Sequence, residues 1–311
     1  KLDFKNLKID SKVSIDELEF LNQLELKKFF PQIGEKITFL DNNLKIAYKK
    51  NKLSLQGEGD ITFQNQKDYI SYNLIKNKDL LNFETSLKIK NNPFSIKIIN
   101  YEKDLNNELN INLKGVSKKN KIILINSVIL KEKINKIEIN DLLINDKYKI
   151  VDIEKIKIDY DDKDKKRNLV ELNKKNKEYI LSGSSLNVNF LLDQILNDSD
   201  TKNNFLNIKN KLNINVKKIF LDSEYYLKNL VGFLILKDQN IPKANIIGNF
   251  SNDKKLRFTI NTQNNEKITT LYSDNAKPIV KRYKFIKGFD DGSLDFYGSK
   301  KLNTSISTLK I

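Results

Sequence analysis

The sequence of 311 residues contains no histidine, cysteine, methionine or tryptophan. Without histidine there is no imidazole to act as a general base, and without cysteine there is no thiolate nucleophile, disulfide or thiolate zinc ligand. A serine hydrolase would then need a Ser-Lys or similar arrangement, and no Gly-x-Ser-x-Gly motif is present. We therefore predict that the chain is not an enzyme and has no catalytic residues, no metal site and no cofactor.

Long hydrophobic runs are also missing. The longest is Val231–Leu236, which is too short to span a bilayer as a helix, since that takes about 20 residues. Glycine and proline are scarce, at 10 and 4 residues, and no Gly-rich phosphate loop follows a strand, so a nucleotide-binding fold is not expected. Because the sequence begins at Lys1 and lacks methionine, we expect it to be part of a longer chain, with any signal peptide or anchor outside it.

Lysine, in contrast, is abundant. The formal net charge is +16, and the 56 basic residues include only three arginines (Arg167, Arg257 and Arg282), which leaves 53 lysines. Nucleic-acid recognition favours arginine concentrated with aromatic residues on one element, whereas these lysines are spread along the whole chain. We therefore expect no nucleic-acid partner. An AT-rich coding sequence would account for the lysines, and attraction to anionic membrane surfaces is the alternative.

The strongest pattern is an alternation of apolar and polar residues, which is typical of strands with one wet face and one dry face. The alternating segments are Leu44–Tyr48, Leu53–Leu55, Phe83–Ile89, Phe94–Ile98, Leu109–Leu113, Ile137–Ile139, Ile156–Tyr160, Leu212–Val216, Ile246–Phe250, Leu256–Ile260, Leu294–Tyr297 and Leu302–Leu309. Clusters of asparagine and aspartate between them, such as Asp41–Asn43, predict turns. Strands recurring about every 10 to 13 residues predict roughly twenty strands in an antiparallel meander.

Only two segments are predicted to be helices. In the first, Asn187 is a candidate N-cap, and one apolar stripe follows it. The members of that stripe are Val188, Leu191, Leu192 and Ile195. In the second, Ser273–Asn275 offers caps, Pro278 stands in the first turn, where a missing N–H is tolerated, and Gly288 ends the helix.

Two further segments have other interpretations. Ser14–Leu24 has a capping-box pair in Ser14 and Glu17 but also alternates, so that helix and strand both stay open. Asp161–Arg167 is the most polar stretch and predicts a solvated hairpin loop. Adjacent acids such as Asp290 and Asp291 are expected at turns rather than as an acid and base couple.

A strand with one dry face must place that face against something. Two short helices cannot cover a sheet of about twenty strands spaced by ~4.8 Å. Aromatic girdles, expected where lipid surrounds a closed sheet, are absent because the 12 tyrosines and 17 phenylalanines are dispersed. Two alternatives remain: a closed sandwich-like module whose sheet packs on itself, and a curled sheet whose dry face binds hydrocarbon. A sixteen-carbon acyl chain would gain about 12 kcal/mol on leaving water.

From about Ser182 onward, the order of motifs resembles a known family. Gly183-Ser184 leads into Phe190-Leu191-Leu192, followed by Leu227–Phe233, Ser273–Val280 and Asp291-Gly292-Ser293-Leu294. This order resembles that of the AsmA-like family of bacterial envelope proteins, in the branch of the YhdP-type and TamB-related proteins. The family has a Gly-Gly-x-Leu step where this chain has Asp291-Gly292-Ser293-Leu294, so the first glycine of the pair is lost.

The resemblance implies a fold and a role. The fold is mostly β, an elongated, curled antiparallel sheet forming a groove, with residues 1–180 as one groove segment and 181–311 as an AsmA-like C-terminal segment with two short helices. The role is periplasmic transport of phospholipid between the inner and outer membranes, or outer-membrane homeostasis, in a chain anchored to the inner membrane. The partners would be phospholipid acyl chains and the two membranes. The predicted lipid-contacting residues are Leu212, Ile214, Val216, Leu234, Leu236, Phe258 and Ile260.

Overall fold

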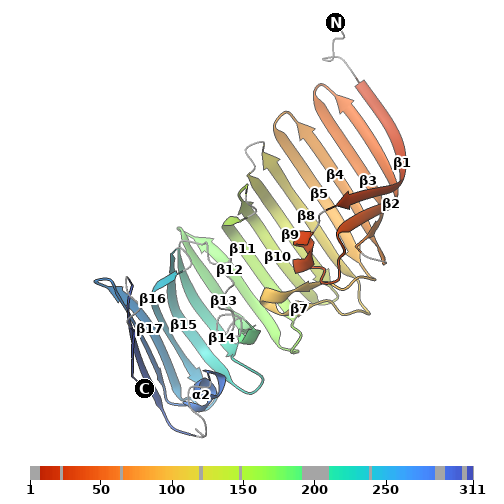
Figure 1. The fold of residues 1–311 in the computed structure, drawn as a ribbon. Coiled ribbons are helices and arrows are strands. Elements are labelled where there is room, and N and C mark those ends of the chain that lie inside the picture. Colours follow the sequence, from red (N-terminus) through yellow and green to blue (C-terminus); the bar gives the residue numbers. More distant parts are fainter. Residues whose placement is uncertain are drawn as a thin grey trace. The chain divides into compact units, whose positions relative to one another are not determined.

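The computed structural model describes residues 8–21, 24–63, 66–118, 122–146, 149–190, 210–237, 240–283, 291–302 and 307–310. Strands dominate these residues, and the one labelled α-helix among them is short. The chain divides into two compact units, an N-terminal unit of Lys1–Lys163 and a C-terminal unit of Asp164–Ile311. Figure 1 shows the strands of both units, and each unit is described separately.

The N-terminal unit is an antiparallel sheet. Its strands are β1 (Lys8–Leu21), β2 (Lys36–Lys49), β3 (Lys52–Thr62), β4 (Lys67–Asn77), β5 (Leu80–Ile89), β8 (Leu109–Lys118), β9 (Ile123–Glu132), β10 (Asn135–Ile144) and β11 (Ile150–Asp161). Each strand pairs with the next in this order, and all these pairings are antiparallel. The unit is therefore a meander with one excursion, between β5 and β8.

Two segments leave this sheet and cover one end of it. They are η2 (Leu24–Lys28) with the turn after it, and the excursion of β6 (Ser95–Ile96), η3 (Lys97–Ile99) and β7 (Tyr101–Glu102). Figure 1 shows η2 and β7 in front of the sheet. Phe30 and Phe94 from these segments are buried with their ring centroids 5.3 Å apart, and Phe30 stacks on Phe63 with centroids 4.0 Å apart. This aromatic cluster, named here the covered end, is part of the buried core of the unit, together with aliphatic residues of the strands such as Ile89, Leu109 and Leu130.

The two faces of the N-terminal sheet differ in chemistry. Directly paired residues of an antiparallel sheet point to the same face. One such row is Ile46–Leu55–Leu74–Phe83, and another is Ile70–Leu87–Ile111–Leu130–Ile137–Ile158. The row Lys45–Gln56–Asn73–Glu84–Lys114 lies between residues of these rows and points to the opposite side. We call the two sides the N-terminal apolar face and the N-terminal polar face.

A β-bulge in β2 keeps the apolar residues on both sides of it on the N-terminal apolar face. The register between β2 and β3 shifts between Leu40 and Asn43, and Asp41 adopts a left-handed φ of 51°. Asn42 is buried and its amide nitrogen donates to the carbonyl of Leu40 over 3.0 Å. The extra residue places Phe39 and Leu44 on the same face despite their odd spacing. The turn predicted at Asp41–Asn43 is therefore wrong, because the strand bulges there instead of ending.

The C-terminal unit also consists mainly of strands. Its strands are β12 (Arg167–Lys175), β13 (Glu178–Asn187), β14 (Lys211–Phe220), β15 (Tyr226–Lys237), β16 (Asn240–Phe250), β17 (Lys255–Gln263), β18 (Glu266–Ser273), β19 (Leu294–Lys301) and β20 (Ser307–Lys310). Consecutive strands pair antiparallel, except that β13 and β14 are parallel. A parallel pair requires a longer connection, here the chain between Asn187 and Lys211.

A short helix, α2 (Lys277–Tyr283), packs beside the C-terminal sheet. Ala276 and Ile279 at its start are buried. The guanidinium of Arg282 donates to the side-chain oxygen of Asn189 over 2.7 Å and to the carbonyl of Leu221 over 2.7 Å. One cation therefore ties α2 to the segments that follow β13 and β14.

The mostly-β fold class with antiparallel pairing, predicted from the alternation, is confirmed. The predicted strand Phe94–Ile98 is confirmed only at β6, Ser95–Ile96, which pairs with β7 outside the large sheet. The chain then turns into η3, and the buried Phe94 closes the covered end. Ser14–Leu24 is resolved as strand as far as Leu21. The helix predicted at Ser273–Gly288 begins as expected, whereas the stripe from Leu191 to Ile195 lies outside the described residues. The division into two compact units falls between Lys163 and Asp164. The division into a groove segment of residues 1–180 and an AsmA-like segment of residues 181–311 stays a prediction.

Candidate functional site

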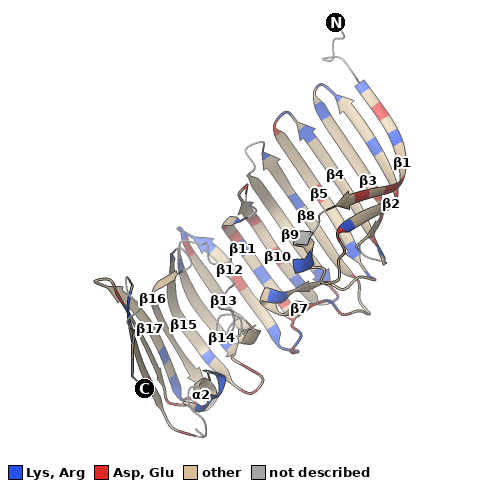
Figure 2. Ribbon diagram, viewed as in Figure 1, with Lys and Arg blue, Asp and Glu red and all other residues tan. Residues whose placement is uncertain are grey.

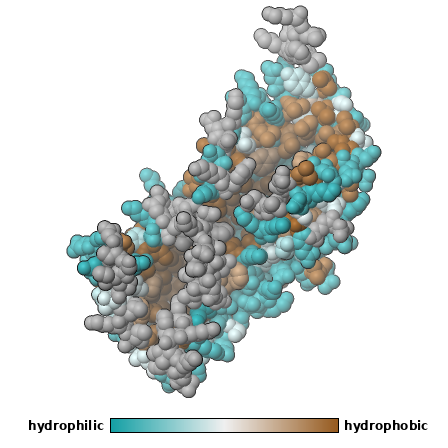
Figure 3. Space-filling model, viewed as in Figure 1, coloured by the Kyte–Doolittle hydropathy of each residue, from teal (hydrophilic) through white to brown (hydrophobic). Residues whose placement is uncertain are grey.

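The N-terminal apolar face is open over the part that lies away from the covered end. Ile9 and Val13 on β1 remain 43% and 37% exposed, and Leu44, Ile46 and Leu74 are only half-buried. Figure 3 shows the hydrophobic surface that these strands present. Buried apolar side chains are the norm in a closed core, so a partly exposed row crossing several strands is a surface suited to apolar ligands.

Aromatic rings keep this face apolar where the sequence places glycine. Gly57 belongs to the apolar face through its pairing with Leu44 and Tyr72. A Cβ atom at Gly57 would lie 2.4 Å from Cζ of Tyr72, so the tyrosine ring occupies the space above the glycine. A larger side chain at residue 57 would displace the Tyr72 ring, which covers the gap that the glycine leaves in the apolar surface.

Hydrogen bonds fix the covered end as a permanent part of the fold. The buried Glu132 carboxylate accepts from the Tyr101 hydroxyl over 2.7 Å and from the backbone N–H of Asp104 over 2.8 Å. The Lys103 ammonium donates to the carbonyls of Lys90 and Asp104 over 3.0 and 3.2 Å. Burial lowers the pKa of Lys103 and raises that of Tyr101. Because these buried polar groups are satisfied within the chain, they form a structural network and not a ligand site.

The C-terminal unit also has an apolar face, and it contains all seven residues predicted to contact lipid. Leu212 pairs with Leu234, and Ile214 pairs with Gly232, which in turn pairs with Ile246. Ile246 pairs with Phe258, and one row away Ala244 pairs with Ile260. The predicted residues come from β14, β15 and β17, and the intervening β16 joins them into one surface, the C-terminal apolar face.

The seven residues divide by burial. Val216, Leu236 and Ile260 are buried, at 0%, 6% and 6% exposure. Leu212, Ile214, Leu234 and Phe258 are half-buried. The first three therefore pack within the protein, and the other four keep the accessible surface that an acyl chain could cover.

Close backbone packing is built into the middle of this face. Gly232 has a φ of +148°, and a Cβ atom there would lie 2.0 Å from the carbonyl oxygen of Asn245 on the neighbouring strand. Only glycine fits this position.

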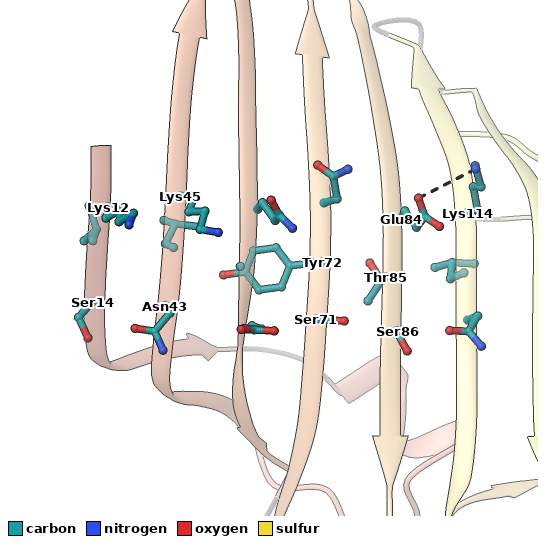
Figure 4. Close-up of a pocket in the computed structure, with 18 of the residues that line it drawn as sticks. Lys12, Ser14, Asn43, Lys45, Ser71, Tyr72, Glu84, Thr85, Ser86 and Lys114 are labelled. Carbon is teal, nitrogen blue, oxygen red and sulfur yellow. Dashed lines mark ion pairs between the residues drawn. The ribbon is translucent and has the colours of Figure 1, made fainter. Parts of the chain in front are cut away.

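The described pocket lies on the N-terminal polar face. It has a volume of about 960 Å³ and runs across β1 to β9, and Figure 4 shows the side chains that line it. Most of them belong to the polar rows, including Lys45, Asn73 and Glu84, and Glu84 lies 4.0 Å from Lys114 in an ion pair. The lining also includes Leu44 and Tyr72, which belong to a row of the apolar face, so the pocket is of mixed polar and apolar character.

Lysine is found on strands of both units (Figure 2), and the apolar faces include charged residues that the alternation did not predict. Lys76 lies on the N-terminal apolar face between its direct partners Leu53 and Leu81. Lys267 and Lys300 pair with each other on the C-terminal apolar face. Lys76 could have been predicted on this face, because it comes two residues after Leu74 and every second residue of a strand points the same way.

No protein-family model, curated protein or solved structure matches the chain. No helix of the described residues is long and apolar enough to cross a membrane. In the same part of the chain, no group of three or more acidic residues could hold a metal ion.

Proposed function

We propose that the chain binds the acyl chains of lipids on its apolar faces. The observation that carries this proposal is the partly exposed apolar surface of each unit, formed by register-paired side chains from several strands. An acyl chain laid over Leu212, Leu234 and Phe258 would remove water from both surfaces, at ~0.8 kcal/mol for each methylene. The attraction is non-directional, so a chain could move along the face without leaving a specific site.

The wider setting belongs to the same proposal. The resemblance of the C-terminal half to AsmA-like proteins supports a periplasmic, non-enzymatic role in phospholipid movement between two membranes. In that setting the chain is one segment of a larger protein held at the inner membrane, and its faces are one stretch of the lipid path.

A structural module without a ligand is the second candidate. The burial of Val216, Leu236 and Ile260 favours it, because these side chains already have their partners within the protein. The two functions differ at the half-buried residues Leu212, Ile214, Leu234 and Phe258. In a lipid-binding protein a ligand covers these side chains, whereas in a structural module they stay in contact with water.

Lipid analysis of the purified chain tests the proposal. The 311-residue chain is isolated without detergent from cells with phospholipid membranes and examined by native mass spectrometry and by organic extraction. We expect phospholipid in stoichiometric amounts. A preparation that carries none, and takes up none from vesicles, would favour the scaffold.

A further inference from the structure

Two lysines stand side by side at the edge of the C-terminal apolar face. Lys267 on β18 pairs directly with Lys300 on β19, and on its other side it pairs with Thr262 on β17. Thr262 comes two residues after Ile260 on the same face, so the two ammonium groups are continuous with the predicted lipid-contacting residues.

This pairing is unfavourable without a third group. Like charges placed directly opposite each other in a sheet repel, and no ion pair joins either lysine to an acid within the described residues. Lys267 is half-buried; burial lowers its pKa, and the charge of Lys300 lowers it further. An anion lying between the two ammonium groups would remove the repulsion.

The surroundings determine what kind of anion fits. The paired positions of β16 to β19 on this face carry apolar, hydroxyl or glycine residues apart from the two lysines, as in Phe258, Leu271 and Phe296. A ligand that presents one anionic group at the edge and hydrocarbon toward the middle would match this surface. Lysine suits such a mobile ligand because its ammonium is a point charge on a flexible stem and imposes no fixed bidentate geometry.

We propose that Lys267 and Lys300 bind the phosphate of a phospholipid headgroup whose acyl chains lie on the C-terminal apolar face. This inference rests on the proposed function and adds to it a headgroup site, at which two paired lysines hold the phosphate. The N-terminal unit repeats the arrangement on a smaller scale, since the exposed Lys76 stands on its apolar face between Leu53 and Leu81.

The test compares two lipids with identical acyl chains, phosphatidic acid and diacylglycerol, offered to the whole 311-residue chain from phosphatidylcholine vesicles at low salt. Each lysine near an anionic headgroup is worth about fivefold in affinity, so we expect the unmodified chain to prefer phosphatidic acid by about twentyfold. The variant K267Q/K300Q should bind both lipids about equally, with its affinity for diacylglycerol unchanged.

The matched control is K243Q/K301Q. Lys243 and Lys301 are exposed, lie in the same unit and pair on the opposite face with Asn261 and Glu266. This control removes the same charge and should keep the twentyfold preference. Equal loss in both variants would overturn the assignment, because it would reduce the effect to net charge.

Two further outcomes are distinguishable. Inorganic phosphate should displace phosphatidic acid no better than chloride at equal ionic strength. If inorganic phosphate binds at Lys267 and Lys300 without affecting lipid uptake, the two lysines form a site for free anions and the headgroup assignment is wrong. If the unmodified chain binds neither lipid, the proposed function itself fails. Thermal unfolding followed by circular dichroism checks that each variant folds.

Discussion

Two neighbouring residues on β4, Leu74 and Ile75, point to opposite faces of the N-terminal sheet, so they can be used to test which face binds lipid. Leu74 belongs to the apolar face through its partners Leu55 and Phe83, whereas Ile75 points to the polar face. Both side chains are half-buried. Replacing each in turn by asparagine therefore makes nearly the same chemical change on opposite sides of one strand.

The magnitude follows from burial. A fully buried leucine side chain is worth ~1.5–3 kcal/mol, so the smaller part of Leu74 that is still exposed offers about 0.5 kcal/mol of contact to an acyl chain. An asparagine amide covered by hydrocarbon loses its hydrogen bonds to water, at about 1 kcal/mol or more. Leu74→Asn should thus weaken lipid binding by about 1.5 kcal/mol, or about tenfold in Kd, whereas Ile75→Asn should leave Kd within about twofold.

Because the chain has no cysteine, a single introduced cysteine can be labelled selectively, and the dye reports on lipid binding near that position. A single Ile46→Cys change, on the same apolar row two strands from Leu74, allows one environment-sensitive dye to be attached. Its emission is titrated with a fatty acid in each background. Equal weakening by Leu74→Asn and Ile75→Asn, or by neither, would refute the assignment of the binding face.

Three other predictions concern stability and pH. Leu109 has no exposed surface under the covered end, so Leu109→Ala should lower the free energy of unfolding by about 3 kcal/mol, measured by urea denaturation. Gly232→Ala should destabilise the chain by about 1–3 kcal/mol in the same assay, because its Cβ would overlap a backbone carbonyl, whereas Gly34→Ala, which meets no atom within 4 Å, should stay within about 0.5 kcal/mol. Burial raises the pKa of Tyr101 and of Tyr160. Since the protonated phenols are favoured in the folded state, their contribution to stability is complete below pH 10 and is lost as pH rises further; ultraviolet titration should show these tyrosines ionising after the others, and only with unfolding.

The period-two alternation predicted the fold class because a strand in a one-faced sheet places every second side chain in the same environment. It failed where a residue changed phase or left the sheet. The bulge at Asp41 looks like a turn in sequence, and Phe94–Ile98 alternates like a strand although its hydrophobic residues close the covered end. Neither can be recognised locally, because each depends on the partner strands.

The candidate site was predictable in part. Leu212, Ile214, Leu234 and Phe258 share a face because alternation fixes which residues of one strand point together, and the meander brings β14 to β17 side by side. The extent of burial was not predictable. Val216 has no exposed surface because of contacts with other segments, and the sequence of its own strand does not show those contacts. The pairing of Lys267 with Lys300 was not predictable either, because it depends on the register between β18 and β19, which the sequence alone does not determine.

Site-specific crosslinking tests the central claim most directly. A photoreactive residue is placed at Ile214 or Leu234, which are half-buried on the C-terminal apolar face, or at their neighbours Asn215 or Ile235 on the opposite face. After irradiation in cells with phospholipid membranes, the purified chain is examined for attached lipid by mass spectrometry. Lipid adducts at Ile214 and Leu234, and none at Asn215 and Ile235, are the predicted result. The absence of adducts at all four positions, or equal adducts on both faces, would contradict lipid binding by the apolar face.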